Sequence, residues 1–218
     1  MSLIVIEGLD GSGKTTQLPL LERELARRGP VRTVSFPDYQ SPSSALVKMY
    51  LGGEFGGSPE SVNAYAAGAF YAVDRYASYQ KAWREDYQAG VTILAARYAT
   101  SNLLYQMEKL PQEQWEQYIE WVEDFEYGKL GLPRPDRVIL LDMPVEVSQR
   151  LLLERYHGEA AKKDLHERDA AFLEHCAACA HFAAERLGWR VVPCAQACEP
   201  LGVEEIHRRV LAALDAPG

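Results

Sequence analysis

The segment from Gly8 to Thr15 has the residue types and spacing that point most directly to chemistry in this sequence. It reads GLDGSGKT, satisfies the pattern GxxxxGK[ST], follows a short apolar run and opens a helical pattern. The glycines let the backbone curl, so that successive N–H groups and the helix N-terminus face a polyphosphate. Lys14 is then placed to bridge the β- and γ-phosphates, and the Thr15 hydroxyl to hold Mg²⁺. The segment predicts a nucleoside triphosphate site made of Gly8, Asp10, Gly11, Ser12, Gly13, Lys14, Thr15 and Thr16.

Asp10 is unusual within this loop, because a carboxylate occupies a segment built to receive anions. Its side chain must therefore point away from the phosphates or pair with a cation. An exposed surface aspartate is one interpretation. The other is an acceptor for a sugar hydroxyl of a second substrate.

Two later segments carry residues suited to a second nucleotide. Tyr71 and Arg75 are four residues apart and share one helical face. An aromatic ring that stacks on a base and an arginine that binds its phosphate form a nucleotide-binding pair. Taken alone, however, such a pair is more often explained by core packing and a solvated arginine. Loops at the carboxyl ends of parallel strands are where open α/β folds place ligands. The residues after the third expected strand, Arg97, Ser101, Tyr105 and Gln106, are therefore candidates for binding a base and a phosphate.

Strand and helix patterns alternate along the chain. Short, uniformly apolar runs, typical of central parallel strands, cover residues 3–7, 31–36, 91–95, 138–142 and 190–192. Helical patterns cover residues 14–28, 62–88, 112–125, 145–156, 170–187 and 204–214. This alternation predicts an α/β fold with an open parallel five-stranded sheet and helices on both faces, of the P-loop NTPase type.

Length and net charge limit the classes of protein to which this sequence can belong. The 218 residues fit one domain spanning residues 1–218, and no repeat or linker divides them. The net charge of −8 disfavours a nucleic-acid-binding protein, which usually needs a broad basic face. No apolar run approaches the roughly 20 residues that span a bilayer, and no secretory signal opens the chain. We therefore expect a cytoplasmic protein that binds small phosphorylated molecules and acts at no membrane.

Cys176 and Cys179 form a CxxC pair beside His175. A zinc or redox site is one interpretation. The other is a pair of buried thiols on one face of the helix at 170–187. The second is favoured, because no further pair of cysteines or histidines has the usual metal-ligand spacing.

Taken in order, these motifs resemble the thymidylate kinases, within the nucleoside monophosphate kinase group. The matching pieces span nearly the whole chain: residues 6–17, Phe36-Pro37-Asp38-Tyr39, residues 70–75, residues 97–106, and Pro135-Asp136 through Leu141-Asp142. The resemblance implies transfer of the γ-phosphoryl group of ATP to dTMP, giving ADP and dTDP in dTTP biosynthesis. It also implies Mg²⁺ and a homodimer, with the tyrosine-rich segment 62–88 as a candidate dimer surface.

The resemblance also assigns roles by position. Asp10 matches the loop carboxylate that faces the dTMP sugar, and Tyr71 the aromatic that stacks on thymine. Arg75 and Arg97 match arginines near the base and phosphate. Residues around the base and sugar correspond to Ser101, Tyr105 and Gln106.

Two positions depart from the family pattern. Relatives usually carry Asp-Arg-Tyr after the third strand, whereas this chain has Ala96-Arg97-Tyr98. Loss of that carboxylate is expected to slow transfer by roughly 10² to 10⁴ if it acts in acid–base chemistry or metal positioning. Glu7, Asp10 and Asp142 are the carboxylates considered as substitutes. The second departure is Tyr39, where many relatives place a phosphate-binding arginine.

A lid is expected at about residues 150–172, after the fourth strand's helix. This segment carries the cations Arg155, Lys162, Lys163 and Arg168. Cations that close over the phosphates stabilise charge on the transferred group and exclude water. Thymidylate kinases whose phosphate loop lacks an arginine supply one from the lid, and the loop of this chain lacks it. The resemblance therefore implies a catalytic set of Lys14, Arg97 and a lid cation, with Arg155 ahead of Arg150 and Lys163.

Two rival functions stay open at this point. One is a kinase for another pyrimidine monophosphate, such as dUMP or UMP. The other is a nucleotide-binding relative whose catalysis is impaired by Ala96. Comparing turnover of dTMP, dUMP and UMP separates the first rival from a thymidylate kinase, and the effect of Ala96→Asp tests the second.

Overall fold

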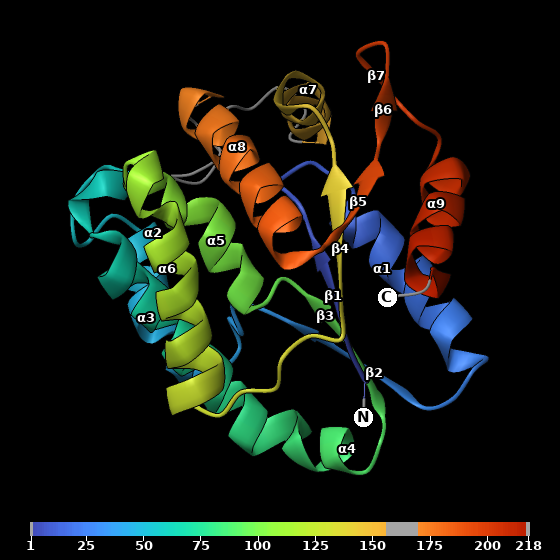
Figure 1. Cartoon of the computed structure of the whole chain (residues 1–218), viewed down its shortest axis with the longest axis horizontal. Coiled ribbons are helices and arrows are strands. Elements are labelled where there is room, and N and C mark those ends of the chain that lie inside the picture. Colours follow the sequence, from blue (N-terminus) through green and yellow to red (C-terminus); the bar gives the residue numbers. More distant parts are fainter. Residues whose placement is uncertain (1, 156–169, 217–218) are drawn as a thin grey trace.

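A computed structural model describes residues 2–155 and 170–216 of the chain. Its central feature is a five-stranded parallel sheet in the order β2-β3-β1-β4-β5 (Figure 1). The strands are β1 Ser2–Glu7, β2 Val31–Ser35, β3 Thr92–Ala96, β4 Arg137–Asp142 and β5 Arg190–Pro193. Each boundary lies within one residue of the sequence prediction, and the predicted fold class is confirmed.

The apolar strands bury both faces of the sheet, as their composition predicted. On β1, Leu3 and Val5 belong to one core cluster, while Ile4 and Ile6 belong to the other. Successive side chains of a strand point to opposite faces, so an unbroken apolar run needs a cover on each side. Helices α1 Lys14–Ala26 and α9 Val203–Asp215 cover one face.

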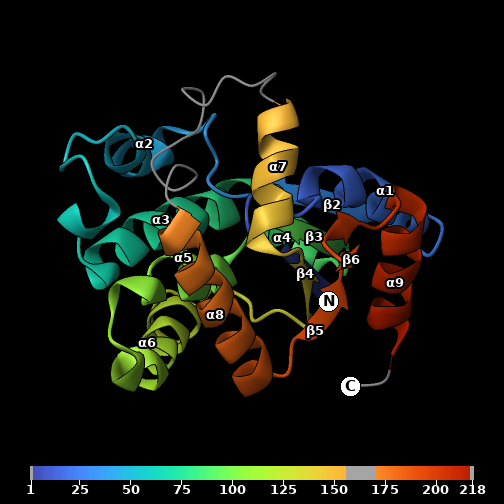
Figure 2. The same cartoon turned by 90° about the horizontal axis from the view of Figure 1, so that it is seen from above.

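The opposite face carries more helices. They are α3 Ala64–Ser78, α5 Asn102–Tyr105, α6 Trp115–Val122 and α8 Ala170–Leu187. Figures 1 and 2 show this group on the other side of the sheet from α1 and α9. Helix α7 Val145–Arg155 stands near the carboxyl ends of the strands. None of the helices in the described ranges is long and apolar enough to cross a membrane.

Several elements differ from the sequence prediction. The expected helix 62–88 begins later, at Ala64, where the Asn63 side chain caps it. It is divided into α3, a π-helical turn at Tyr79–Trp83 and α4 Arg84–Gln88. The expected helix 112–125 becomes α6 followed by a π-helical turn at Glu123–Lys129. Helix α2 Ala45–Leu51, helix α5 and the hairpin β6 Ala195–Gln196 with β7 Glu199–Pro200 were not predicted. These are short elements, for which sequence periodicity carries little signal.

Candidate active site

The phosphate loop connects the end of β1 to the start of α1. Gly11 and Gly13 have φ angles of 81° and 94°, in the left-handed region that glycine adopts without strain. A Cβ atom on Gly11 would lie 2.5 Å from the carbonyl oxygen of Ser148 in α7. The loop therefore requires glycine for its turn and for its close approach to α7.

Lys14 and Thr15 begin α1 and face a large cavity. The Lys14 Nζ donates hydrogen bonds to the carbonyl oxygens of Gly8 (2.6 Å) and Leu9 (2.7 Å), so the ammonium lies across the loop. The cavity has a volume of about 700 Å³. We call it the donor cavity; it is lined by the loop and α1 from Asp10 to Leu18, by Ala96 and Arg97, and by the segment 200–206.

A second cavity of about 290 Å³ lies beside it, and we call it the acceptor cavity. All seven residues that the sequence suggested for the second substrate line it: Asp10, Tyr71, Arg75, Arg97, Ser101, Tyr105 and Gln106. Tyr39 lines it too, together with residues that sequence reasoning missed, among them Ser35, Leu51, Tyr98 and Asn102. Leu51 ends the unpredicted helix α2, and Ser35 ends β2 without a motif of its own. Tyr98 and Asn102 lie within the matching segment 97–106 but were given no role there.

Asp10 and Arg97 form an ion pair between the two cavities, since both side chains line each of them. The Tyr105 hydroxyl also donates to Asp10, at 3.1 Å, and the Arg97 guanidinium lies 5.0 Å from the centre of the Tyr105 ring. Partial burial raises the pKa of Asp10, but the charges of Arg97 and Lys14 and these hydrogen bonds outweigh it and lower the pKa to about 2. Of the two options that the sequence left open for Asp10, pointing away from the phosphates or pairing with a cation, the structure shows a cation pair.

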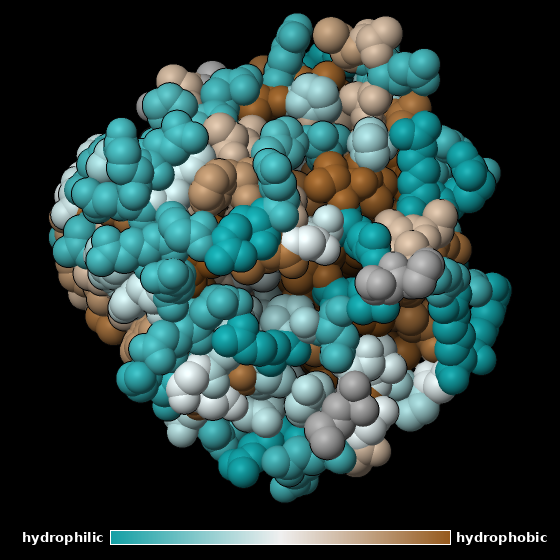
Figure 3. Space-filling view, in the orientation of Figure 1, coloured by the Kyte–Doolittle hydropathy of each residue, from teal (hydrophilic) through white to brown (hydrophobic). Residues whose placement is uncertain are grey.

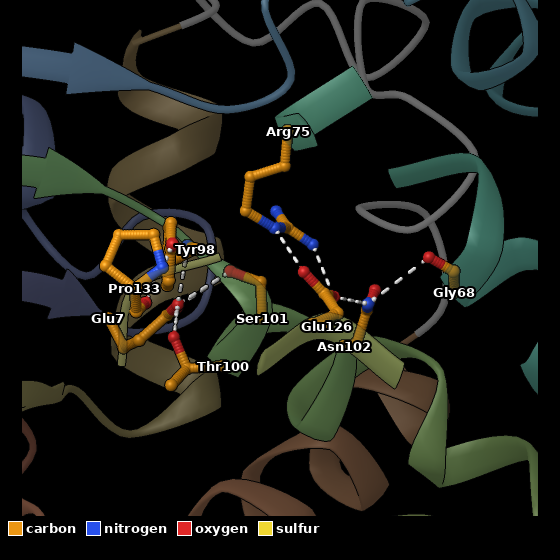
Figure 4. Close-up of polar contacts among 9 residues, drawn as sticks. All are labelled: Glu7, Gly68, Arg75, Tyr98, Thr100, Ser101, Asn102, Glu126 and Pro133. Carbon is orange, nitrogen blue, oxygen red and sulfur yellow. Dashed lines mark hydrogen bonds and ion pairs between the residues drawn. The ribbon is translucent and has the colours of Figure 1, made fainter. Parts of the chain in front are cut away.

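Arg75 is almost fully buried, with 1% of its surface exposed. Its Nε and Nη2 donate to the two carboxylate oxygens of Glu126 at 2.7 and 2.8 Å, and Asn102 donates to the same carboxylate at 2.9 Å (Figure 4). The guanidinium lies over the rings of Phe36 and Tyr98. Burial lowers the pKa of Arg75, but the charge of Glu126 raises it above its usual value. Arg75 thus reaches the acceptor cavity as one half of a buried ion pair.

Ala96 ends β3 and lines the donor cavity with Lys14 and Thr15. Of the three carboxylates considered as substitutes for the missing aspartate, Asp10 lines this cavity. Glu7 is fully buried and accepts hydrogen bonds from Thr100 and Ser101. Asp142 lies 2.9 Å from the Nε2 atom of His181. Asp10 is therefore the carboxylate of these three that is in position to face a bound triphosphate.

The lid prediction falls mostly outside the described residues. Lys162, Lys163 and Arg168 belong to the undescribed segment 156–169. Arg155 is the last residue of α7, and its side chain is outside the description. Arg150 donates to the carbonyl oxygen of Cys198 at 3.1 Å and to Glu199 at 2.9 Å, which ties α7 to the β6–β7 hairpin.

The CxxC cysteines are buried thiols, as the favoured interpretation predicted. Cys176 and Cys179 are fully buried in α8 and are not disulfide-bonded. Burial raises the pKa of both thiols, that of Cys179 to about 12. In the described part of the chain no group of three or more His, Cys, Asp or Glu side chains is arranged to hold a metal ion.

The family model described as thymidylate kinase matches residues 6–206. A thymidylate kinase of Mycobacterium tuberculosis is 35% identical over 200 residues, covering 87% of this chain and 90% of the relative. The chain belongs to the thymidylate kinase family. Another relative, the thymidylate kinase of Caenorhabditis elegans, is 29% identical over 156 residues, covering 67% of this chain and 65% of its own length.

Among solved structures, a thymidylate kinase from Candida albicans has a TM-score of 0.69. The alignment covers 98% of this chain and 91% of the other, at 21% identity. At that identity the likeness shows the fold. It places this member of the thymidylate kinase family on the same architecture as a solved thymidylate kinase.

Proposed function

We propose that this chain transfers the γ-phosphoryl group of ATP to dTMP, giving ADP and dTDP, as a step of dTTP biosynthesis. The observation that carries this proposal is the pair of adjoining cavities with Asp10 and Arg97 on the wall of both. A phosphoryl group that passes directly between two nucleotides needs two pockets with a shared, charged junction. Membership of the thymidylate kinase family identifies the acceptor.

The donor side holds the triphosphate through the phosphate loop. Backbone N–H groups at the start of α1 and the Lys14 ammonium face the β- and γ-phosphates. On binding, Lys14 exchanges its bonds to the Gly8 and Leu9 carbonyl oxygens for phosphate oxygens. Binding thus replaces neutral acceptors with charged ones, which strengthens the hydrogen bonds.

Arg97 is proposed to stabilise the transferred group at the junction. Its guanidinium is held by Asp10, and burial lowers its pKa while the Asp10 charge raises it, so that the pKa lies well above its usual value. The residue therefore stays cationic in the site. A fixed cation at the point where charge develops lowers the barrier without reorganisation. Lys14 and Arg155 complete the proposed catalytic set.

The residues around the donor cavity fit a magnesium ion. Thr15 presents an exposed hydroxyl at the start of α1, and Asp10 presents an ionised carboxylate in the same cavity. Mg²⁺ usually takes one or two carboxylates or hydroxyls, the substrate phosphates and several waters. When bound there, held by Thr15, it would neutralise charge on the phosphate oxygens.

The acceptor cavity fits a pyrimidine nucleotide. Tyr71 lines it and offers a ring for stacking, and Asp10 and Ser101 line it with oxygens that can accept from sugar hydroxyls. Gln106 is buried, and its Oε1 atom has no hydrogen-bond partner among the described residues. A buried acceptor without a partner is costly, so a ligand N–H such as that of thymine is favoured there.

We further propose that the protein works as a homodimer in the cytoplasm, with the segment 150–172 of its single domain acting as a lid. The four cysteines are all unpaired, which fits a reducing compartment. Val73 and Tyr76 on α3 are exposed to 48% and 38%, and supply apolar surface for a subunit contact within the segment 62–88.

The deciding experiment is steady-state ADP production with ATP, Mg²⁺ and dTMP, run beside dUMP and UMP. We expect turnover on the order of 1–10³ s⁻¹ with dTMP. We expect kcat/KM for dTMP to exceed that for dUMP by a factor of about 10 to 100. One methyl group in a hydrophobic pocket contributes about 1–3 kcal/mol to the discrimination between two substrates. A preference for UMP would overturn the thymidylate assignment.

The same assay on Ala96→Asp, with Ala96→Asn as the uncharged control, tests the departure at this position. We expect the aspartate variant to have a higher kcat than the unchanged protein, and the asparagine variant to stay close to it. Negligible turnover that only the aspartate restores would indicate a damaged site on an intact fold. If none of the three proteins produces ADP although each still binds ATP, a nucleotide-binding protein without kinase activity would be favoured.

A further inference from the structure

Glu7, the last residue of β1, is a fully buried carboxylate outside both cavities. A charge in this position must be satisfied by hydrogen bonds or by a counter-ion. Among the described side chains, no cation forms a contact ion pair with it. Its partners come instead from one short segment, residues 98–101, which follows β3 and leads into α5.

Three groups of that segment donate to Glu7 (Figure 4). The Thr100 Oγ1 donates to Oε1 at 2.6 Å, and the Tyr98 amide donates to the same oxygen at 3.2 Å. The Ser101 hydroxyl lies 2.8 and 2.9 Å from the two carboxylate oxygens. One side chain therefore holds three of four consecutive residues.

The residue immediately before the segment 98–101 has a strained backbone. Arg97 has a φ angle of 62°, in the left-handed region that side chains other than glycine, asparagine and aspartate rarely adopt. Strain of this kind persists when surrounding contacts over-determine the backbone. The Arg97 amide donates to the Ile6 carbonyl oxygen at 3.2 Å, and the Glu7 contacts follow at once. Glu7 thus supports the conformation that directs Arg97 toward the junction.

The Ser101 contact also decides how that hydroxyl meets a ligand. A serine hydroxyl has one proton and two lone pairs. Because Glu7 takes the proton, the Ser101 oxygen presents lone pairs toward the acceptor cavity that it lines. It is therefore suited to accept from a sugar O–H or a ring N–H, and unsuited to donate to a phosphate.

From these contacts we infer that Glu7 is a positioning residue of the acceptor site: it fixes residues 97–101 and holds Ser101 as a hydrogen-bond acceptor for the nucleoside part of the substrate. The effect on catalysis rests on the proposed function, because dTMP is the substrate whose binding is measured. Glu7 acts through Arg97 and Ser101 and touches neither cavity.

Thr100 supplies the cleanest variant, since it lines neither substrate cavity. Thr100→Val keeps the shape and removes the hydroxyl that donates to Glu7, whereas Thr100→Ser keeps the hydroxyl and serves as the matched control. We expect Thr100→Val to raise the dissociation constant of dTMP by about fivefold, which is the change in an equilibrium constant that the loss of one hydrogen bond typically causes. ATP binding should change less, because Arg97 is the one residue of the segment 97–101 that lines the donor cavity, and Thr100→Ser should keep the dTMP affinity of the unchanged protein.

Glu7→Gln tests the charge, because it keeps the size of the side chain and places an amide beside Ser101. We expect a larger loss in kcat/KM for dTMP than in Thr100→Val. Amide hydrogen exchange of residues 97–101 should speed up in both variants and stay slow in Thr100→Ser. The exchange measurement needs no substrate.

These readouts separate the possible failures. If the unchanged protein neither binds nor phosphorylates dTMP, the proposed function fails, while the exchange rates still decide whether Glu7 holds the segment. Unchanged exchange and unchanged dTMP affinity in Thr100→Val and Glu7→Gln overturn the inference. A lower free energy of unfolding with kcat and dTMP affinity unchanged also overturns it, because Glu7 would then serve the fold and not the site.

Discussion

At the scale of single residues, the ion pair of Asp10 with Arg97 is the feature on which the site depends. Both residues came from the sequence, but for different reasons: Asp10 as an anomaly in a loop that receives anions, and Arg97 by its place after a strand. Their contact explains the anomaly, because the carboxylate neutralises the charge of the half-buried Arg97 guanidinium.

The lowered pKa of Asp10 makes this ion pair measurable through pH. Since the pKa is about 2 in the folded chain against 3.8 ordinarily, the ionised carboxylate stabilises the fold above about pH 4, and this contribution is lost as the pH falls toward 2. The shift corresponds to about 2 kcal/mol. We expect Asp10→Asn to lower the free energy of urea unfolding by about that amount at pH 7, and by less at pH 3.

Asp124→Asn is the control for this series. Asp124 pairs with Lys129 on the surface, where both side chains are more than 60% exposed. Exposed ion pairs contribute about 0–1 kcal/mol, so this variant should change little at either pH. A difference between Asp10→Asn and the unchanged chain that stays constant from pH 7 to pH 3 would contradict the assignment.

At the scale of elements, the phosphate loop is held from two sides. Helix α1 continues it, and α7 packs so closely against it that Ser148 leaves no room for a side chain at position 11. The glycines of the motif therefore serve the contact between elements as well as the phosphate. The second such link joins α3 to the π-helical turn at Glu123–Lys129 through Arg75 and Glu126.

A substitution at Gly11 tests the first link. Gly11→Ala places a Cβ 2.5 Å from a backbone oxygen and at a positive φ angle, so the loop must move away from α7. We expect ATP binding, measured by calorimetry, to weaken by about tenfold or more, since the N–H groups no longer converge. Gly29→Ala, where a Cβ meets nothing within 4 Å, should bind ATP normally. Equal affinities in the two variants would show that this contact does not shape the site.

A substitution at Glu126 tests the second link. Glu126→Gln leaves the Arg75 guanidinium buried without its counter-charge, which typically costs about 3–5 kcal/mol. We expect denaturant unfolding to show a loss of this size. The double variant Arg75→Met, Glu126→Leu should recover part of it, because no charge is then left unpaired. A double variant as unstable as Glu126→Gln would argue against charge burial as the cause.

At the scale of the whole molecule, net charge and the position of the cations bear on how the chain can bind nucleotides. The net charge is −8, and the face in Figure 3 is largely hydrophilic, with smaller hydrophobic areas between the hydrophilic side chains. The cations proposed to bind the nucleotides lie around the two cavities: Lys14, Arg75 and Arg97. A net acidic chain can therefore bind polyanions, because a few buried or half-buried cations act at short range.

The proposed homodimer is tested on α3. We expect sedimentation equilibrium to give a mass of twice the 24.5 kDa chain. Val73→Glu should shift the mass toward the monomer, because it places a charge at the centre of the proposed apolar contact. Val191→Glu, at a position on β5 exposed to 43%, should remain dimeric. A monomeric unchanged protein, or equal effects of both variants, would exclude α3 as the contact.

The sequence by itself determined the features that neighbouring residues encode. The apolar runs specify the five strands because residues 3–6 must bury both faces, and the glycine spacing before Lys14 specifies the phosphate loop because only that backbone curls in this way. The seven residues that line the acceptor cavity were also named from the sequence: four by their place after a strand, Tyr71 and Arg75 by their helical spacing, and Asp10 as an anomaly of the phosphate loop.

Only the tertiary structure decided which groups those residues meet. Arg75 was expected to bind a phosphate, yet it pairs with Glu126, 51 positions away, in a π-helical turn that no periodicity marks. Glu7 was considered a substitute metal ligand, yet its oxygens are taken by Thr100 and Ser101, more than 90 positions away. Partners so distant meet only once the sheet has assembled, and a buried charge then binds whichever donors the packing presents.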